Sequence, residues 1–133
     1  MPANTVDLDF ADGNYLFALP LPRITELQEK TGVGIGRLFA RVLKGCYTDD
    51  DGNEAILPAH GEFYVLDLVE TIRQALIGGG RGIVNGEEIK VNAALADRLI
   101  KGYVETAPLA ESWKTAAAIL ATVIVGFDPP KKD

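Results

Sequence analysis

The spacing of apolar residues changes once along this chain, near residue 20, and this change constrains the fold more than any other feature. Before it, Val6, Leu8 and Phe10 alternate with acidic residues, which is the period of a strand with one buried face. A polar turn that contains glycine separates this stretch from a second apolar segment over residues 15–19. The sequence therefore predicts a β-hairpin over about residues 5–20.

After residue 20, apolar residues recur every three or four positions, which is the spacing of helices that bury one face. Glycine or proline ends most of these stretches, because neither residue continues a helix interior well. The five expected helices cover approximately residues 22–31, 35–44, 62–77, 92–103 and 108–127. Two strands alone are marginally stable in water, so the hairpin must pack on these helices.

The length of 133 residues matches one domain. We therefore expect a single-domain α+β fold, mostly α, over residues 1–133. It comprises the N-terminal β-hairpin, about five packed helices over residues 22–127, and a frayed C-terminal tail over residues 128–133.

The helical stripes also predict core residues. Trp113 and Tyr103 lie on apolar faces, so we expect both to be buried, although aromatic residues are also enriched at protein interfaces. By the same spacing, the third helix buries Leu66, and the last helix buries Leu109 and Ile124.

Two segments lack a clear period. Cys46–Gly61 is polar and contains several glycines and prolines, so it is predicted to be a loop. Arg81–Val91 follows three glycines that should end the third helix, and it contains an Asn-Gly turn and one short extended piece. Asn92 is a good N-cap for the helix that follows.

Composition argues against several classes of function. Thirteen Lys and Arg against nineteen Asp and Glu leave a net charge of −6, so the chain should not bind nucleic acid through bulk charge. A single cysteine excludes an intramolecular disulfide framework and any multi-cysteine metal site. The N-terminus does not resemble a secretory signal, and the longest apolar run, residues 116–127, is shorter than the roughly 20 residues that cross a bilayer. We therefore expect an intracellular protein without nucleic-acid or membrane partners.

Two kinds of segment resemble ligand-binding motifs but do not meet their requirements. The acidic run 49–54 resembles a calcium loop, but Tyr47 and Pro58 occupy two positions that need a carboxylate. The glycine-rich segments 32–37 and 78–82 follow expected helices rather than strands, and they lack the remaining residues of phosphate-binding loops.

The other candidates are isolated polar residues. Cys46 and His60 are the only cysteine and the only histidine, and nothing in their spacing favours a catalytic pair. Arg37, Arg41 and Lys44 form a basic edge on the second helix, for which a solvated face is a simpler explanation than an anion site. The sequence therefore predicts no catalytic, cofactor-binding or metal-binding residue, no cofactor and no enzymatic activity.

The order of several short segments carries a resemblance to a known family. These segments are the N-terminal hairpin leading into Ile24–Gly32, the helix end Ala75–Gly80, the helix start Pro108–Glu111, and the final stretch with Ala118–Ala121 and Val125–Gly126. In this order the chain resembles the gene transfer agent family proteins, which group with the tail assembly chaperones of long-tailed phages. The resemblance covers nearly the whole chain, and the departures are the long acidic loop 46–61 and an apparent insertion at 81–91.

The resemblance implies a non-enzymatic assembly factor of a phage, prophage or gene transfer agent. Tail assembly chaperones hold the tape measure protein, a long helical and aggregation-prone chain, until tail tube subunits polymerise around it. The implied partners are the tape measure protein and, as a second candidate, the tail tube protein, in the cytoplasm of a bacterial host; a homo-oligomer is compatible with this role. Two alternatives stay open: a structural tail component such as a tail tube subunit, and a helical module that regulates another protein.

Overall fold

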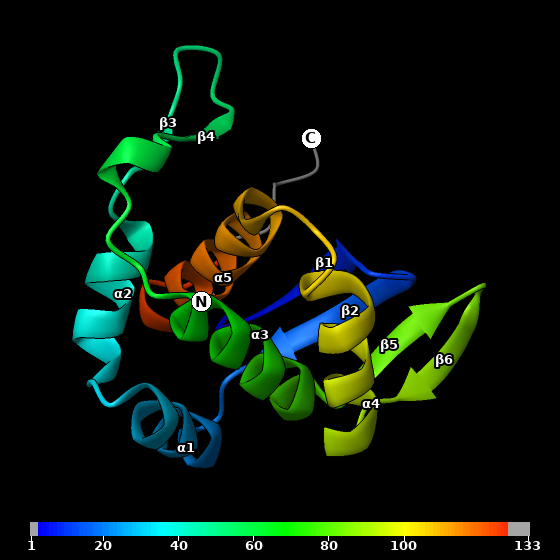
Figure 1. Ribbon diagram of the computed structural model, residues 1–133. Helices are drawn as coiled ribbons and strands as arrows, with labels where there is room; N and C mark the ends of the chain where they lie inside the picture. Colours follow the sequence, from blue (N-terminus) through cyan, green and yellow to red (C-terminus); the bar gives the residue numbers. More distant parts are fainter. Residues whose placement is uncertain (1–2, 128–133) are drawn as a thin grey trace.

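A computed structural model of the protein describes residues 3–127, in which a four-stranded sheet packs against a group of helices (Figure 1). The elements in chain order are β1 Thr5–Phe10, β2 Gly13–Ala18, α1 Leu21–Thr31, α2 Ile35–Leu43, β3 Cys46–Thr48, β4 Glu54–Ile56, the 3₁₀ turn η1 Pro58–His60, α3 Val65–Gly79, β5 Arg81–Val84, β6 Glu87–Lys90, α4 Ala93–Leu99, the π-helical turn η2 Ile100–Val104 and α5 Leu109–Ile124. The predicted α+β, mostly α, fold with an N-terminal hairpin and five helices is confirmed. The tail expected over 128–133 lies outside the described residues.

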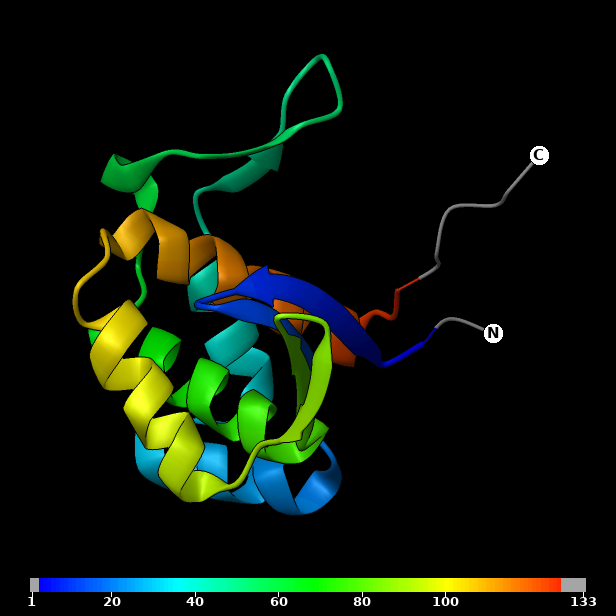
Figure 2. The same cartoon turned by 90° about the vertical axis from the view of Figure 1, so that its right-hand side faces the viewer.

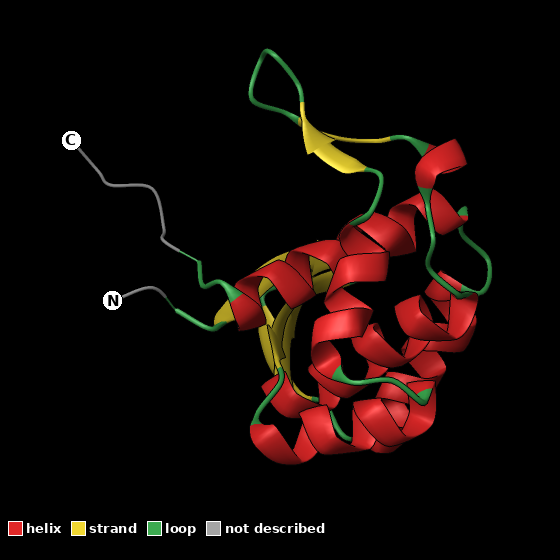
Figure 3. Ribbon diagram, turned by 90° about the vertical axis from the view of Figure 1, so that its left-hand side faces the viewer, coloured by secondary structure: helices red, strands yellow, loops and turns green. Residues whose placement is uncertain are grey.

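The N-terminal hairpin supplies one face of the core. β1 runs antiparallel to β2, with Val6 opposite Phe17 and Leu8 opposite Tyr15. Phe10 meets the rings of Tyr15 and Phe17 edge to face, with ring centroids 6.0 and 5.6 Å away. The alternation that predicted the hairpin therefore places its apolar side chains toward the helices, which lie along one side of the sheet (Figure 3).

A second hairpin extends the sheet, and the sequence indicated only its Asn-Gly turn and one short extended piece. β5 pairs antiparallel with β2, and β6 pairs with β5, so the strand order is β1-β2-β5-β6 (Figure 2). The segment 81–91 is thus part of the sheet rather than an inserted surface segment with one extended piece. Gly82 lies opposite Tyr15, and a Cβ on Gly82 would come within 2.5 Å of that ring, so the close pairing requires glycine.

Helix α3 crosses the centre of the molecule and rests on the backbone of β2. It begins at Val65, three residues later than expected, and only the last of the three glycines, Gly80, ends it, with a left-handed φ of 71°. Gly78 and Gly79 remain helical and lie against β2, where a Cβ on either residue would be about 2 Å from a carbonyl oxygen. The prediction that all three glycines end the helix was therefore wrong.

The buried face of α3 also differs from the predicted stripe. The sheet, α1, α4 and α5 all contact this helix, so its buried residues spread over several sides. They are Asp67, Leu68, Thr71, Ile72, Gln74, Ala75 and Leu76. Leu66, predicted to be buried, lies exposed in the first turn of the helix.

The fourth helix starts as predicted, and its backbone hydrogen-bonding pattern then changes from α-helical to π-helical. The side chain of Asn92 caps α4 by accepting a hydrogen bond from the backbone N–H of Leu95 at 2.8 Å. The chain then widens into η2, where the N–H of Glu105 bonds to the carbonyl of Ile100, five residues back. One additional residue in a turn rotates the following side chains by roughly 100°. Tyr103 is consequently 44% exposed, and its predicted burial was wrong.

The last helix, α5, buries only the middle part of its predicted apolar face. Trp113, Ala116 and Leu120 are buried as predicted. Leu109 and Ile124, at the two ends of α5, are exposed, because the neighbouring elements cover only the middle turns.

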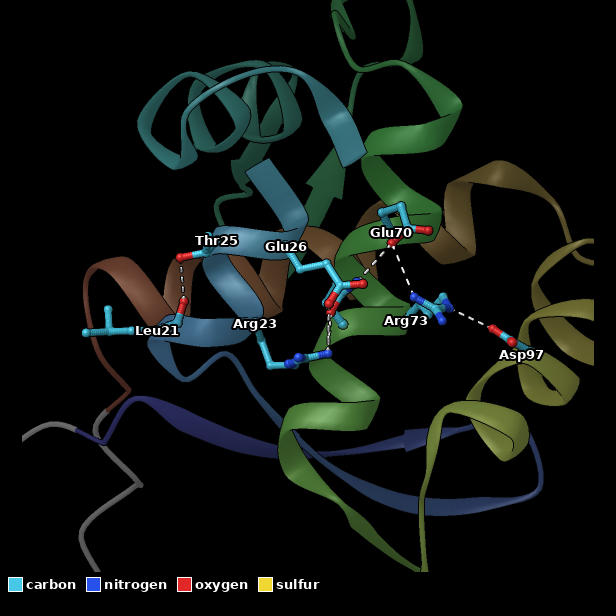
Figure 4. A network of polar contacts seen from close by, with 8 residues as sticks. Leu21, Arg23, Thr25, Glu26, Glu70, Arg73 and Asp97 are labelled. Atoms are coloured by element: carbon cyan, nitrogen blue, oxygen red, sulfur yellow. Dashed lines mark hydrogen bonds and ion pairs between the residues drawn. The ribbon is translucent and has the colours of Figure 1, made fainter. Parts of the chain in front are cut away.

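Polar side chains join α1, α3 and α4 at the side of α3 that faces away from the sheet (Figure 4). The buried amide of Gln74 accepts from Arg23 at 3.2 Å and donates to Glu70 at 3.3 Å. Arg73 donates to Asp97 of α4 at 2.6 Å, and this hydrogen bond raises the pKa of the Arg73 guanidinium. The network satisfies the buried amide of Gln74 and joins the three helices.

Candidate protein-binding surface

Residues 46–56, which we call the arm, form a hairpin that projects from the body of the protein (Figures 1 and 2). Cys46 of β3 lies opposite Ile56 of β4, and Thr48 lies opposite Glu54. The prediction of an irregular loop was wrong here. Each strand has three residues, which is too short for an alternating pattern to be recognised.

Trp113 fixes the point where the arm leaves the body. Its indole N–H donates to the carbonyl of Val42, at the end of α2, over 2.6 Å. The ring centroid lies 4.8 Å from that of Phe63, and a Cβ on Gly45 would lie 3.1 Å from the indole. Trp113 is only 2% exposed, so its predicted burial is confirmed, and it anchors the base of the arm to α5.

An apolar groove runs between the arm and α5. It encloses about 170 Å³ and is lined by Leu43, Cys46, Tyr47, Thr48, Glu54, Ala55, Ile56, Lys114, Ala117, Ala118 and Ala121. Three alanines of α5 form one wall, so no long side chain from these positions fills the groove. Tyr47, which is 46% exposed, lies at the opposite wall, and Lys114 and Glu54 place one charge of each sign on the rim.

The structure does not bring Cys46 and His60 together as a hydrogen-bonded pair within the described residues. Cys46 lines the groove, and its thiol contacts the carbonyl oxygen of Val42 at 3.7 Å. Burial, and to a smaller extent the charge of Glu54, raises the pKa of this thiol, which disfavours the nucleophilic thiolate. His60 ends the turn η1 on the exposed surface.

The acidic run 49–54 forms the tip of the arm. The carboxylate of Asp49 accepts hydrogen bonds from the backbone N–H groups of Asp51, at 3.0 Å, and Asn53, at 2.8 Å. Gly52 adopts a φ of 83°, which favours glycine. The tip is therefore an ordered turn in which Asp50 and Asp51 are exposed. Across residues 3–127, no three His, Cys, Asp or Glu side chains lie together as a metal site would need.

The basic edge of α2 is partly buried. Arg37 and Lys44 are exposed, as a solvated face requires, but Arg41 is not. Its guanidinium lies 2.6 Å from the carboxylate of Asp67, which is 1% exposed, and 4.8 Å above the ring of Tyr64. The sequence carried no signal for this ion pair, because Asp67 belongs to another helix.

Exposed apolar residues at the start of α3 lie next to this basic edge. Tyr64 is 69% exposed, and Val65 and Leu66 follow it at the start of α3. A depression of about 510 Å³ lies between α2 and this segment and is lined by Arg37, Ala40, Arg41, Lys44, Glu62 and Tyr64. We call this depression, together with Val65 and Leu66, the basic patch.

No known protein family matches this chain, and neither a curated protein nor a solved structure is significantly similar to it. None of the helices within residues 3–127 is both long enough and apolar enough to pass through a bilayer. The arm groove and the basic patch are the candidate sites within the described residues.

Proposed function

We propose that this protein is a non-enzymatic tail assembly chaperone of a phage, prophage or gene transfer agent, which binds the tape measure protein during tail assembly. The family resemblance of the sequence motivates the proposal, and the groove between the arm and α5 is the observation that carries it. In this role the protein acts in the cytoplasm of its bacterial host.

The groove suits a helical client for two reasons. Its wall of Ala117, Ala118 and Ala121 has small side chains, so a second helix can approach α5 closely. The arm forms the other wall, and Tyr47 and Ile56 supply apolar surface to the client's apolar face. A client helix bound there would insert a few of its apolar side chains between α5 and the arm.

The size of the groove suits a chaperone that must release its client. At about 170 Å³ it accommodates a few apolar side chains rather than a whole helix face. A few such contacts bury little apolar surface, so we expect the client to dissociate rapidly. The client can then pass to the polymerising tail tube.

Co-expression with the tape measure protein of the same gene cluster tests the proposal. The wild-type protein should keep this client soluble and co-purify with it. Ala118→Arg fills the groove and should abolish co-purification, whereas Ala94→Arg, on an exposed position of α4, should not. If wild type fails to bind the client, the function is rejected; if Ala118→Arg binds normally, the groove is not the client site.

Analysis of finished particles distinguishes a chaperone from the alternative, a structural component of the tail. A chaperone should be absent from finished particles, and deletion of its gene should leave heads without tails. Mass spectrometry that finds this chain as a major component of the tail would favour a tail tube subunit. Normal tails in the deletion strain would contradict both roles.

A further inference from the structure

We propose that copies of this chain associate head to tail, with the acidic tip of one copy's arm bound to the basic patch of the next copy. The proposal does not depend on the chaperone function, and of the arm groove it involves only Tyr47 and Glu54, which also lie beside the tip. It rests on two oppositely charged surfaces within one chain, each of which also exposes apolar residues.

The donor surface is the tip of the arm. Asp49, Asp50, Asp51 and Glu54 concentrate four acidic residues there, and the hydrogen bonds of Asp49 hold the turn in one conformation. Because the turn is already ordered, binding costs little conformational entropy. Tyr47 projects an exposed ring close to the acidic residues.

The acceptor surface is the basic patch. Between Val33 and Thr48 the chain has three basic residues and no acidic one, although the whole protein carries a net charge of −6. Asp67 already neutralises Arg41, and Lys44 lies 3.8 Å from Glu62 in an exposed, weak pair. Arg37 and Lys44 are thus the cations available to a partner.

Apolar contacts accompany the charges on this acceptor surface. Tyr64, Val65 and Leu66 are consecutive and exposed, and Tyr64 borders the depression beside α2. Exposed aromatic residues next to arginine are typical of protein interfaces. The tip of an arm, with its carboxylates and Tyr47, complements both features of this surface.

The contact must form between copies. The arm leaves the body beyond the end of α2, and its tip points away from the α2 of its own chain (Figures 1 and 3). A tip that binds the patch of a second copy leaves that copy's own tip free, so the interface is heterologous and can build rings or open chains. The net charge of −6 opposes association, so we expect a weak, concentration-dependent assembly.

Sedimentation velocity of charge-reversal variants tests the proposal on the 133-residue chain. The tip variant is Asp50→Lys with Asp51→Lys, and the edge variant is Arg37→Glu with Lys44→Glu. Each alone should weaken association by about tenfold or more relative to wild type, because like charges then face each other. An equimolar mixture of the two should associate again, because the reversed tip of one variant complements the reversed edge of the other.

Two controls carry the same changes in net charge at distant exposed positions. Glu87→Lys with Glu88→Lys on β6 matches the tip variant, and Arg98→Glu with Lys101→Glu matches the edge variant. Each control should associate more tightly than the variant whose net charge it matches. Circular dichroism should be the same for all variants, since every substitution lies on the surface.

Three outcomes would overturn the proposal. The first is a wild-type protein that stays monomeric at millimolar concentration. The second is a mixture of folded tip and edge variants that does not associate. The third is a loss of association in the controls equal to that in the variants, which would show that net charge alone governs the behaviour. Recovery of association in the mixture alone would support the specific contact.

Discussion

Two glycines near the end of α3 allow a helix to lie directly on the backbone of a strand. A Cβ on Gly79 would lie 1.8 Å from the carbonyl oxygen of Leu16, and one on Gly78 would lie 2.0 Å from that of Ala18. Both carbonyls belong to β2, where Leu16 and Ala18 pair with residues of β1, so a shift of either would disturb this pairing. These two positions therefore tolerate no side chain, although a helix interior generally disfavours glycine.

Gly79→Ala should consequently destabilise the protein, by about 3 kcal/mol or more, because the collision outweighs the gain in helix propensity. Gly36→Ala in α2 is the matched control, since nothing lies within 4 Å of a Cβ built there. It should stabilise the protein by about 0.5–1 kcal/mol. Denaturant unfolding followed by circular dichroism measures both effects, and equal stability of the two variants would contradict the close approach.

Trp113 is a further residue on which local structure depends. Trp113→Ala removes a buried ring and its hydrogen bond to Val42, so it should cost about 3–5 kcal/mol of unfolding free energy. Trp113→Phe keeps most of the apolar volume and should cost less. Circular dichroism is the appropriate probe, because this is the only tryptophan of the chain. A Trp113→Ala protein as stable as wild type would show that the indole is not part of the core.

At the scale of elements, the two additional hairpins have different roles. β5 and β6 complete the sheet against β2 and cover Tyr15, whereas the arm projects from the body. Replacing Tyr47–Ala55 by Asn-Gly should change the unfolding free energy by less than about 1 kcal/mol, because a short turn replaces an exposed loop. Replacing Gly82–Ile89 by Asn-Gly should cost at least about 3 kcal/mol, because it uncovers core residues. Denaturant unfolding of the two deletions should therefore give very different midpoints.

The tip of the arm should not bind calcium with useful affinity. Asp49 already accepts two backbone hydrogen bonds, and Tyr47 and Pro58 occupy positions where a calcium loop needs ligands. Titration calorimetry should show no binding in the micromolar range. Micromolar binding that disappears in Asp51→Ala would contradict this expectation.

At the scale of the whole molecule, stability should fall at alkaline pH because of one buried phenol. Tyr15 is fully buried, and burial followed by its hydrogen bond to Asp12 raises its pKa above the usual value. The folded protein thus keeps a proton that the unfolded chain releases near pH 10. Stability from this group is complete below that pH and decreases above it by up to about 1.4 kcal/mol per pH unit.

The comparison of wild type with Tyr15→Phe isolates this effect. Between about pH 10 and pH 11.5, the unfolding free energy of wild type should decrease more steeply than that of the variant. The slopes are compared rather than the absolute values, because the substitution also removes the hydrogen bond to Asp12. Equal slopes would show that Tyr15 titrates normally in the folded protein.

Features that depend on neighbouring residues could be predicted from the sequence. The alternation around Val6 predicted the first hairpin, the spacing of apolar residues predicted five helices, and Asn92 predicted a cap. The burial of Trp113 followed from its place in the middle of a stripe. All of these follow from the period of a strand or helix and from local hydrogen bonding, which a chain shows along its own length.

Tertiary structure alone decided the features that join distant segments. Pairing between β2 and β5 made the segment 81–91 part of the sheet, and the π-helical turn rotated Tyr103 out of the core. Arg41 found its partner Asp67 on another helix. The candidate site is of this kind too, since the arm groove joins residues 46–56 to α5, more than fifty residues later. No local period encodes such contacts, because the free energy that selects them comes from burying surfaces that meet only when the whole chain is folded.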